Sequence, residues 1–155
     1  MTEFEGRLLA VGRIAVVVSR YHERITSRLL EGAIVACREA GVPDTDVDVL
    51  WVSGAFELGL VVTAAAHSGR YVAIVALGVV IRGETPHFEY VAGETSAALA
   101  RAATDTLVPV GFGLLTCDTM EQAEARSGGT AGNKGREATE AALRTADLVH
   151  QALEE

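Results

Sequence analysis

Residues 76–93 read ALGVVIRGETPHFEYVAG, and the prediction of the fold starts from this segment. It begins inside an apolar run, residues 72–81, which is typical of a strand buried on both faces of a parallel sheet. It then passes through the polar turn 82–85 into a helical pattern that starts near Pro86. Open α/β sheets place their binding sites where strands end and helices begin, so we expect functional residues in this turn.

The rest of the chain repeats the pattern of an apolar strand followed by a helix. Strands are predicted over residues 14–18, 47–52, 72–81 and 109–115, and helical faces over 25–37, 55–68, 86–102, 121–126 and 136–153. Such alternation favours parallel strands joined by right-handed crossovers. We therefore predict an α/β fold: a flavodoxin-like three-layer αβα sandwich, built as a single domain over residues 1–155, whose four strands lie in the order 2-1-3-4.

Composition excludes several classes of protein. Hydrophobic residues make up 49% and charged residues 22%, as in ordinary globular proteins. The net charge of −8 argues against a nucleic-acid partner. The apolar runs are too short to cross a membrane, and nothing at the N-terminus resembles a signal peptide, so we expect a cytoplasmic protein.

Two segments have no clear period. Residues 1–13 form a mixed arm that could pair with another chain, and residues 127–135, SGGTAGNKG, are predicted to be a Gly-rich loop. Of the 13 basic residues only Lys134 is a lysine, which suggests that an ammonium group is wanted in this loop. The cysteines lack metal-ligand spacing, and Cys37 is expected in the core.

Polar and aromatic side chains gather where the predicted strands end. Tyr21 and His22 follow the first strand, residues 54–57 follow the second, and residues 83–87 follow the third. Because parallel strands end at one edge of the sheet, these groups should meet there. They fit a planar, hydrogen-bonding ligand that carries an anion, with aromatic stacking from Tyr21 and Phe112 and a carboxylate from Glu57. Core packing of Phe112 and helix capping by Glu57 are the structural alternatives.

The turn before the third helix offers an acid–base group and an anion cradle. The positive helix end disfavours a charged imidazolium at His87, which suits proton transfer near neutral pH; a solvated histidine is the alternative. The backbone of residues 83–85 and the Thr85 hydroxyl could hold a phosphate, or form a simple turn. Arg126 and Lys134 could add positive charge, or be a solvated pair. There is no metal-ligand cluster and no GxGxxG motif, so no cofactor is expected.

Several of these segments, taken in order, resemble one known family. SRY at residues 19–21, GAFE at 54–57, IRGETPHF at 81–88 and AGNKG at 131–135 are similar to the motifs of 6,7-dimethyl-8-ribityllumazine synthases. The resemblance covers nearly the whole chain. It implies condensation of 5-amino-6-(ribitylamino)uracil with 3,4-dihydroxy-2-butanone 4-phosphate, with release of phosphate and water and without a cofactor.

The resemblance also implies a role for each candidate residue. His87 would be the proton shuttle. Glu84, Thr85 and Arg126 would bind the phosphate. The pyrimidine and its ribityl chain would contact Tyr21, Ala55, Phe56, Glu57, Val80, Ile81, Phe112 and Lys134.

Assembly follows from the same resemblance. Arg126, Phe112 and Lys134 would come from a neighbouring subunit of a pentamer, and the compact loop before Lys134 resembles that of members that close into 60-subunit shells. The chain departs from the family at Ser53 and Gly59, where proline is common, and at Thr130, where lysine is common.

Three other readings compete with this one. A flavin- or lumazine-binding shell protein would not need His87 or the phosphate-binding residues. An archaeal-type riboflavin synthase would not need to recognise a phosphate, against which Thr85 and Arg126 weigh. A Schiff-base enzyme centred on Lys134 would need a desolvated pocket around the amine, and a Gly-rich loop does not supply one.

Overall fold

A four-stranded parallel sheet forms the centre of the protein. The structure, a computed structural model, describes residues 1–153. Its strands lie in the order β2-β1-β3-β4, which confirms the predicted order 2-1-3-4. Their bounds are β1 Ile14–Ser19, β2 Val47–Val52, β3 Ala73–Ile81 and β4 Val110–Cys117.

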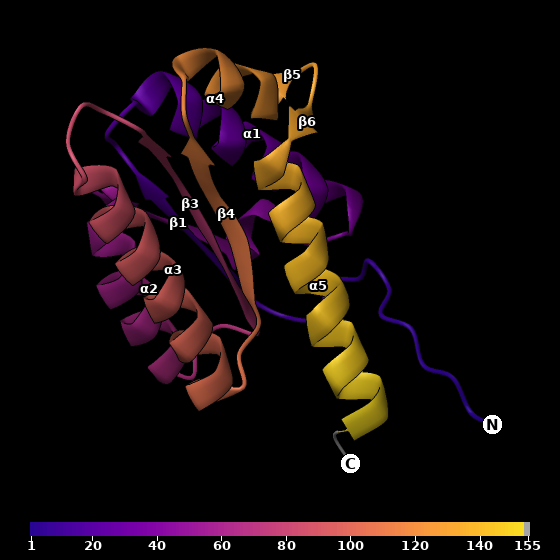
Figure 1. Ribbon diagram of the computed structural model, residues 1–155. Coiled ribbons are helices and arrows are strands. Elements are labelled where there is room, and N and C mark those ends of the chain that lie inside the picture. Colours follow the sequence, from indigo (N-terminus) through magenta and orange to yellow (C-terminus); the bar gives the residue numbers. More distant parts are fainter. Residues whose placement is uncertain (154–155) are drawn as a thin grey trace.

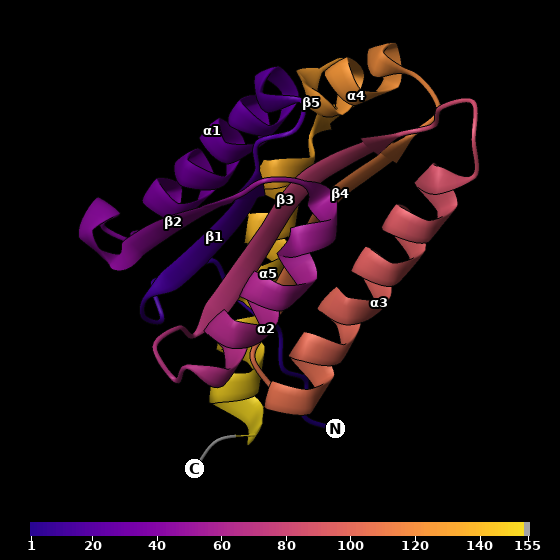
Figure 2. The ribbon, with the colours of Figure 1, turned by 90° about the vertical axis from the view of Figure 1, so that its left-hand side faces the viewer.

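Helices cover both faces of this sheet, as predicted for the αβα sandwich (Figures 1 and 2). The helices α1 (Glu23–Glu39) and α5 (Lys134–Leu153) pack on one face. The helices α2 (Leu58–His67) and α3 (His87–Thr106) pack on the other. The short α4 (Met120–Arg126) follows β4, and single 3₁₀ turns precede β2 (η1, Asp44–Asp46) and α2 (η2, Ala55–Glu57).

The alternation of side chains along β1 explains why this strand is central. Val16 and Val18 belong to the core beneath α1 and α5, whereas Ala15 and Val17 belong to the core beneath α2 and α3. Every residue of β1 is buried, which requires apolar side chains on both faces of the strand. The run of β-branched residues thus specifies an interior parallel strand.

Two glycines allow helices to approach closely. A Cβ atom on Gly135 would lie 2.0 Å from the carbonyl oxygen of Leu29, so this residue lets α5 lie against the backbone of α1. A Cβ atom on Gly59 would lie 2.8 Å from the Cβ of Ala98, so Gly59 lets α2 approach α3. The departure from proline at Gly59 therefore has a packing reason.

The segment 127–135 differs from the predicted loop. It forms a small antiparallel hairpin, β5 (Ser127–Gly129) with β6 (Gly132–Asn133), and α5 begins at Lys134 and not at Arg136. Gly128 and Gly132 have φ values of 109° and 81°, which glycine adopts easily. The predicted second helix also begins differently, because residues 55–57 form a 3₁₀ turn.

The N-terminal arm lies along α5 of its own chain. The backbone N–H of Arg7 donates to Asp147 Oδ2 over 2.8 Å, and the guanidinium binds the same carboxylate. Gln151 Nε2 donates to the carbonyl oxygen of Glu5 over 2.7 Å. The Asp147 side chain is 2% exposed, so the arm supplies the bonds that a buried carboxylate needs.

Two further sequence predictions concern Cys37 and membrane-spanning segments. Cys37 is buried as predicted, and burial, with Asp44 nearby, raises the pKa of its thiol to about 11. No helix within residues 1–153 has the length and apolar character needed to cross a membrane.

Asp147→Asn tests the contact between the arm and α5. Hydrogen bonds from Arg7 hold the pKa of Asp147 below its ordinary value, so the carboxylate stabilises the fold above the unfolded-state pKa of about 3.9. We expect the variant to unfold at lower urea concentration at pH 7, and the difference to shrink as acid protonates the wild-type carboxylate. Urea midpoints of both proteins, measured from pH 7 down to below the unfolded-state pKa, test the loss of stability and its dependence on pH.

Asp44→Asn is the matched control for that experiment. Asp44 also pairs with an arginine, Arg38, which lowers its pKa, but its side chain is 64% exposed. Exposed pairs contribute little to stability. A loss in the Asp44 variant as large as in the Asp147 variant would contradict the importance of burial.

Candidate functional site

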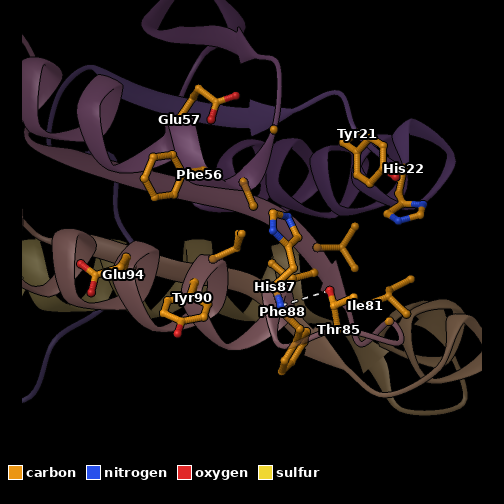
Figure 3. Close-up of a pocket in the computed structure, with 16 residues that line it drawn as sticks. Tyr21, His22, Phe56, Glu57, Ile81, Thr85, His87, Phe88, Tyr90 and Glu94 are labelled. Atoms are coloured by element: carbon orange, nitrogen blue, oxygen red, sulfur yellow. Dashed lines mark hydrogen bonds between the residues drawn. The ribbon is translucent and has the colours of Figure 1, made fainter.

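A pocket of about 850 Å³ opens at the carboxyl ends of β1, β2 and β3, on the side of the sheet covered by α2 and α3 (Figure 3). The ends of three parallel strands, the 3₁₀ turn η2 and the N-terminal part of α3 surround it. Its walls are therefore drawn from segments that lie far apart in the sequence. The lining residues are Tyr21, His22, Gly54, Ala55, Phe56, Glu57, Val79, Val80, Ile81, Gly83, Thr85, His87, Phe88, Tyr90, Val91 and Glu94.

Most of the predicted site residues lie on this pocket. β1 leads to Tyr21, and the end of β3 brings Val80 and Ile81. The 3₁₀ turn η2 brings Ala55, Phe56 and Glu57, and the loop before α3 brings Thr85 and His87.

Four predicted residues do not line the pocket within one chain. Glu84 belongs to the adjacent loop, and Phe112 lies on β4 with 52% of its surface exposed. Arg126 ends α4, where its guanidinium donates to the carbonyl oxygen of Gln122 over 3.1 Å. Lys134 begins α5 and pairs with Glu137 over 3.4 Å.

The loop between β3 and α3 places His87 at the start of a helix. Pro86 occupies the N-cap position with φ −71°, and His87 is the first residue of α3. The His87 N–H donates to the Thr85 hydroxyl over 3.4 Å, the dashed line in Figure 3. Within residues 1–153, the N–H groups of Gly83, Glu84 and Thr85 donate to no acceptor. These free donors beside a helix N-terminus suit an anion.

Four polar side chains of the pocket have no partner among residues 1–153. In the described part of the chain, the functional groups of Glu57, His87, Tyr90 and Glu94 take part in no hydrogen bond or ion pair. Tyr21 contacts His22 through its ring, with the two ring centroids 4.5 Å apart. Polar groups that converge on a cavity without partners are available to a ligand.

Sequence reasoning missed part of the α3 wall. Tyr90, Val91 and Glu94 lie three, four and seven positions after His87 and share its face of the helix. That spacing was visible in the sequence, and it would have added these three residues once His87 was placed on the site.

His22 also lines the pocket, in a strained backbone conformation. Its φ is 60° and its ψ 50°, the left-handed region that non-glycine residues rarely adopt. The only other described non-glycine residue with positive φ is Leu107, which ends α3 far from the pocket. Such strain commonly persists at functional sites.

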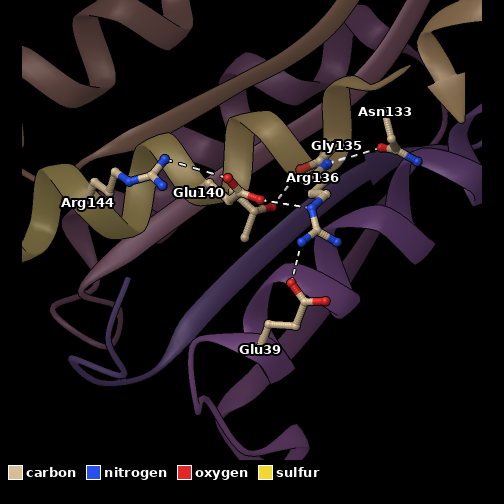
Figure 4. A network of polar contacts seen from close by, with 7 residues as sticks. Glu39, Asn133, Gly135, Arg136, Glu140 and Arg144 are labelled. Carbon is tan, nitrogen blue, oxygen red and sulfur yellow. Dashed lines mark hydrogen bonds and ion pairs between the residues drawn. The ribbon is translucent and has the colours of Figure 1, made fainter. Parts of the chain in front are cut away.

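The AGNKG motif fixes the start of α5 (Figure 4). Asn133 Oδ1 accepts from the Arg136 N–H over 3.1 Å, and its Nδ2 donates to the carbonyl oxygen of Arg28 over 3.0 Å. Arg136 binds Glu39 on α1 and lies 2.9 Å from Glu140. Together with Gly135, these contacts dock α5 on α1 and set where Lys134 emerges.

The described residues near the site give little support to a reactive thiol or to a metal centre. Cys117 ends β4 but is buried, and burial raises the pKa of its thiol while the Arg126 charge opposes that rise. Residues 1–153 contain no group of three or more His, Cys, Asp or Glu side chains placed to hold a metal ion.

Comparison with known proteins gives one consistent result. The model of a family described as 6,7-dimethyl-8-ribityllumazine synthase matches residues 12–150. A protein of that name from Gemmatimonas aurantiaca is 54% identical over 154 residues, which cover 99% of this chain and 94% of the relative. Proteins of the same name from Anaeromyxobacter sp. and Syntrophus aciditrophicus are 48% and 50% identical; the matches cover 98% and 97% of this chain and 94% and 98% of the relatives.

His22→Gly tests the strain beside the pocket. Because glycine adopts positive φ without a Cβ clash, we expect the free energy of unfolding to rise by about 1 kcal/mol. His22→Ala keeps the Cβ atom and should not stabilise. Leu107→Gly, a matched change far from the pocket, should stabilise similarly. Denaturant unfolding measures the free energy of unfolding of the three variants. Equal stability of the Gly and Ala variants at residue 22 would contradict the strain.

Proposed function

The chain belongs to the 6,7-dimethyl-8-ribityllumazine synthase family, and we propose that it condenses 5-amino-6-(ribitylamino)uracil with 3,4-dihydroxy-2-butanone 4-phosphate in the cytoplasm. It is a transferase of riboflavin biosynthesis. The proposed products are 6,7-dimethyl-8-ribityllumazine, phosphate and water. The observation that carries the proposal is the pocket. It combines aromatic faces with polar side chains, an imidazole and backbone N–H donors that have no partner within residues 1–153.

The pyrimidine substrate would occupy the part of the pocket nearest the strand ends. The exposed ring of Tyr21 would stack on the flat pyrimidine, and the backbone of Val80 and Ile81 would bond its edge. The ribityl hydroxyls would reach Ala55, Phe56 and Glu57 at the start of α2. The Glu57 carboxylate, which has no partner in the described chain, is suited to accept from a hydroxyl.

The phosphate of the second substrate would bind the loop before α3. The N–H groups of Glu84 and Thr85 have no acceptor among residues 1–153, and the Thr85 hydroxyl can donate its proton. The Glu84 carboxylate would have to point away from the anion. Arg126 would supply the positive charge, since the guanidinium of Arg82 in this loop is paired with Asp118 and Glu89.

His87 would move protons between these two subsites. The substrate amine attacks the ketone carbon, a C–N bond forms, and the carbonyl oxygen leaves as water after accepting protons. His87 would donate a proton to that oxygen and later take one from carbon as the phosphate ester C–O bond breaks. The enol left by this elimination becomes a ketone, and the ribitylamino nitrogen attacks its carbon. This second C–N bond closes the ring, and the second carbonyl oxygen leaves as a second water. Holding both substrates side by side removes much of the entropy cost of their encounter.

The site would be complete only in an oligomer. Phe112, Arg126 and Lys134 lie outside the pocket of their own chain, and Phe112 is half exposed on the edge strand β4. We propose that a neighbouring subunit supplies these three residues, in a pentamer that closes into a 60-subunit shell. Each chain would act as a single domain and contribute residues to two sites.

His87→Ala should slow turnover by roughly 10²-fold, the lower end of what general acid–base catalysis supplies, and leave the assembly unchanged. His67→Ala, at the exposed end of α2, is the control histidine and should not change the rate. Lumazine absorbance and phosphate release measure turnover with both substrates. Equal rates in wild type and the His87 variant would remove His87 from the mechanism, and tight pyrimidine binding by wild type without product would favour a binding protein.

Arg126→Ala should raise the KM of the phosphate substrate far more than that of the pyrimidine. Mixed oligomers of this variant with His87→Ala then test where Arg126 comes from. If Arg126 acts across the interface, random mixing of equal amounts restores about one quarter of the sites, because such sites combine a wild-type His87 with a wild-type Arg126. If both residues act within one chain, the mixture shows only the average activity of the two variants.

A further inference from the structure

The loop between β3 and α3 has little of its own to hold it in place. Residues 82–87 are all exposed, and a Cβ atom on Gly83 would meet nothing within 4 Å. Within residues 1–153 its N–H groups have no acceptor, apart from that of Arg82 at the strand end and the long bond from His87 to Thr85. The same loop carries the proposed phosphate donors, which must be held in position to bind well.

Arg82 makes contacts on both sides of this loop. Its N–H donates to the carbonyl oxygen of Cys117 over 2.9 Å, and its Nε donates to Asp118 Oδ1 over 2.9 Å. On the other side its guanidinium lies 4.6 Å from the ring centroid of Phe88 and 3.6 Å from the Glu89 carboxylate, both in the first turn of α3. One side chain thus joins the end of β4 to the start of the helix that carries His87.

Asp118 is itself held by the start of α4. Its N–H donates to Gln122 Oε1 over 2.7 Å, and Gln122 takes part in the capping box with Thr119. The contacts therefore run from the cap of α4 through Asp118 and Arg82 to the first turn of α3. This arrangement fixes both ends of the loop 83–86.

We propose that Arg82 is a positioning residue that holds the phosphate-binding loop through Asp118 and the first turn of α3, without contacting the substrate itself. This inference rests on the proposed function of the loop. Two carboxylates, Asp118 and Glu89, lie against the single positive charge of Arg82 and offset it. Arg82 is for that reason poorly suited to bind the anion directly, and Arg126 remains the proposed cation.

The expected effects are moderate, because these pairs are exposed. The side chains of Arg82, Asp118 and Glu89 are 48%, 65% and 66% exposed. Pairs of this kind are individually weak, and the ring contact adds a comparable amount. Loss of the whole arrangement should weaken phosphate binding by roughly fivefold to tenfold.

Arg82→Met and Asp118→Asn distinguish positioning from direct binding. A positioning role predicts that both variants raise the KM of the phosphate substrate about equally, leave the KM of the pyrimidine nearly unchanged, and give a double variant no worse than either single one. Direct binding by Arg82 predicts the opposite for Asp118→Asn, which would free the guanidinium and tighten phosphate binding. Asp44→Asn, which breaks the exposed Arg38 pair far from the loop, is the matched control and should change neither KM.

Calorimetric titration of the assembled protein with inorganic phosphate gives a second readout that needs no turnover. Equal weakening of phosphate binding in both variants supports the positioning role even if the wild type fails to make the lumazine, in which case only the proposed reaction fails. Three results would overturn the inference: normal phosphate affinity in both variants, weakening in the Arg82 variant alone, or no phosphate binding by the wild type. If the wild type turns over both substrates in the same preparation, any of these results overturns the role of Arg82 and leaves the proposed function standing.

Discussion

The parallel pairing of β1 with β3 is the contact on which the site depends. These two interior strands run in register from Ile14 beside Ala73 to Val18 beside Leu77, and both are almost fully buried. Because they run in the same direction, Tyr21 after β1 and Ile81 at the end of β3 emerge at one edge. A shift of one residue in the register between β1 and β3 would exchange the side chains on the two faces of β3. Tyr21 and Ile81 would then no longer be placed together at this edge. Burial of the strands therefore positions the chemistry as well as stabilising the fold.

The docking of α5 on α1 is the second constraint, and it explains a motif that looked chemical. In Gly132-Asn133-Lys134-Gly135, the asparagine caps α5 and binds the backbone of α1, and the last glycine permits the close approach. The lysine takes no part in these contacts and pairs with Glu137 on its own helix. A sequence motif can thus be specific because of packing even where one member of it is proposed to serve the site.

Patterns in the sequence predicted the sheet order, the layers and most of the pocket wall. Strand-end residues such as Tyr21, Glu57 and His87 could be predicted from the sequence, because parallel topology brings strand ends together. The hairpin at residues 127–133 was missed because glycine-rich segments lack a period, and its pairing depends on the neighbouring α4 and α1. The contacts of Arg82 were also beyond sequence reasoning, since Asp118 lies 36 positions away and meets it only through the pairing of β3 with β4.

The free polar groups of the pocket have a physical consequence for assembly. Within residues 1–153, two carboxylates, an imidazole and several backbone donors of this edge form no hydrogen bond, and large aromatic side chains such as Phe56 and Tyr90 are exposed beside them. Natural proteins keep such local inconsistencies where function requires them. In the proposed oligomer, a neighbouring subunit would cover these aromatic side chains and bring cations toward the free donors. Assembly and substrate binding would then satisfy the same groups, so that the surface least suited to a monomer is the one on which catalysis depends.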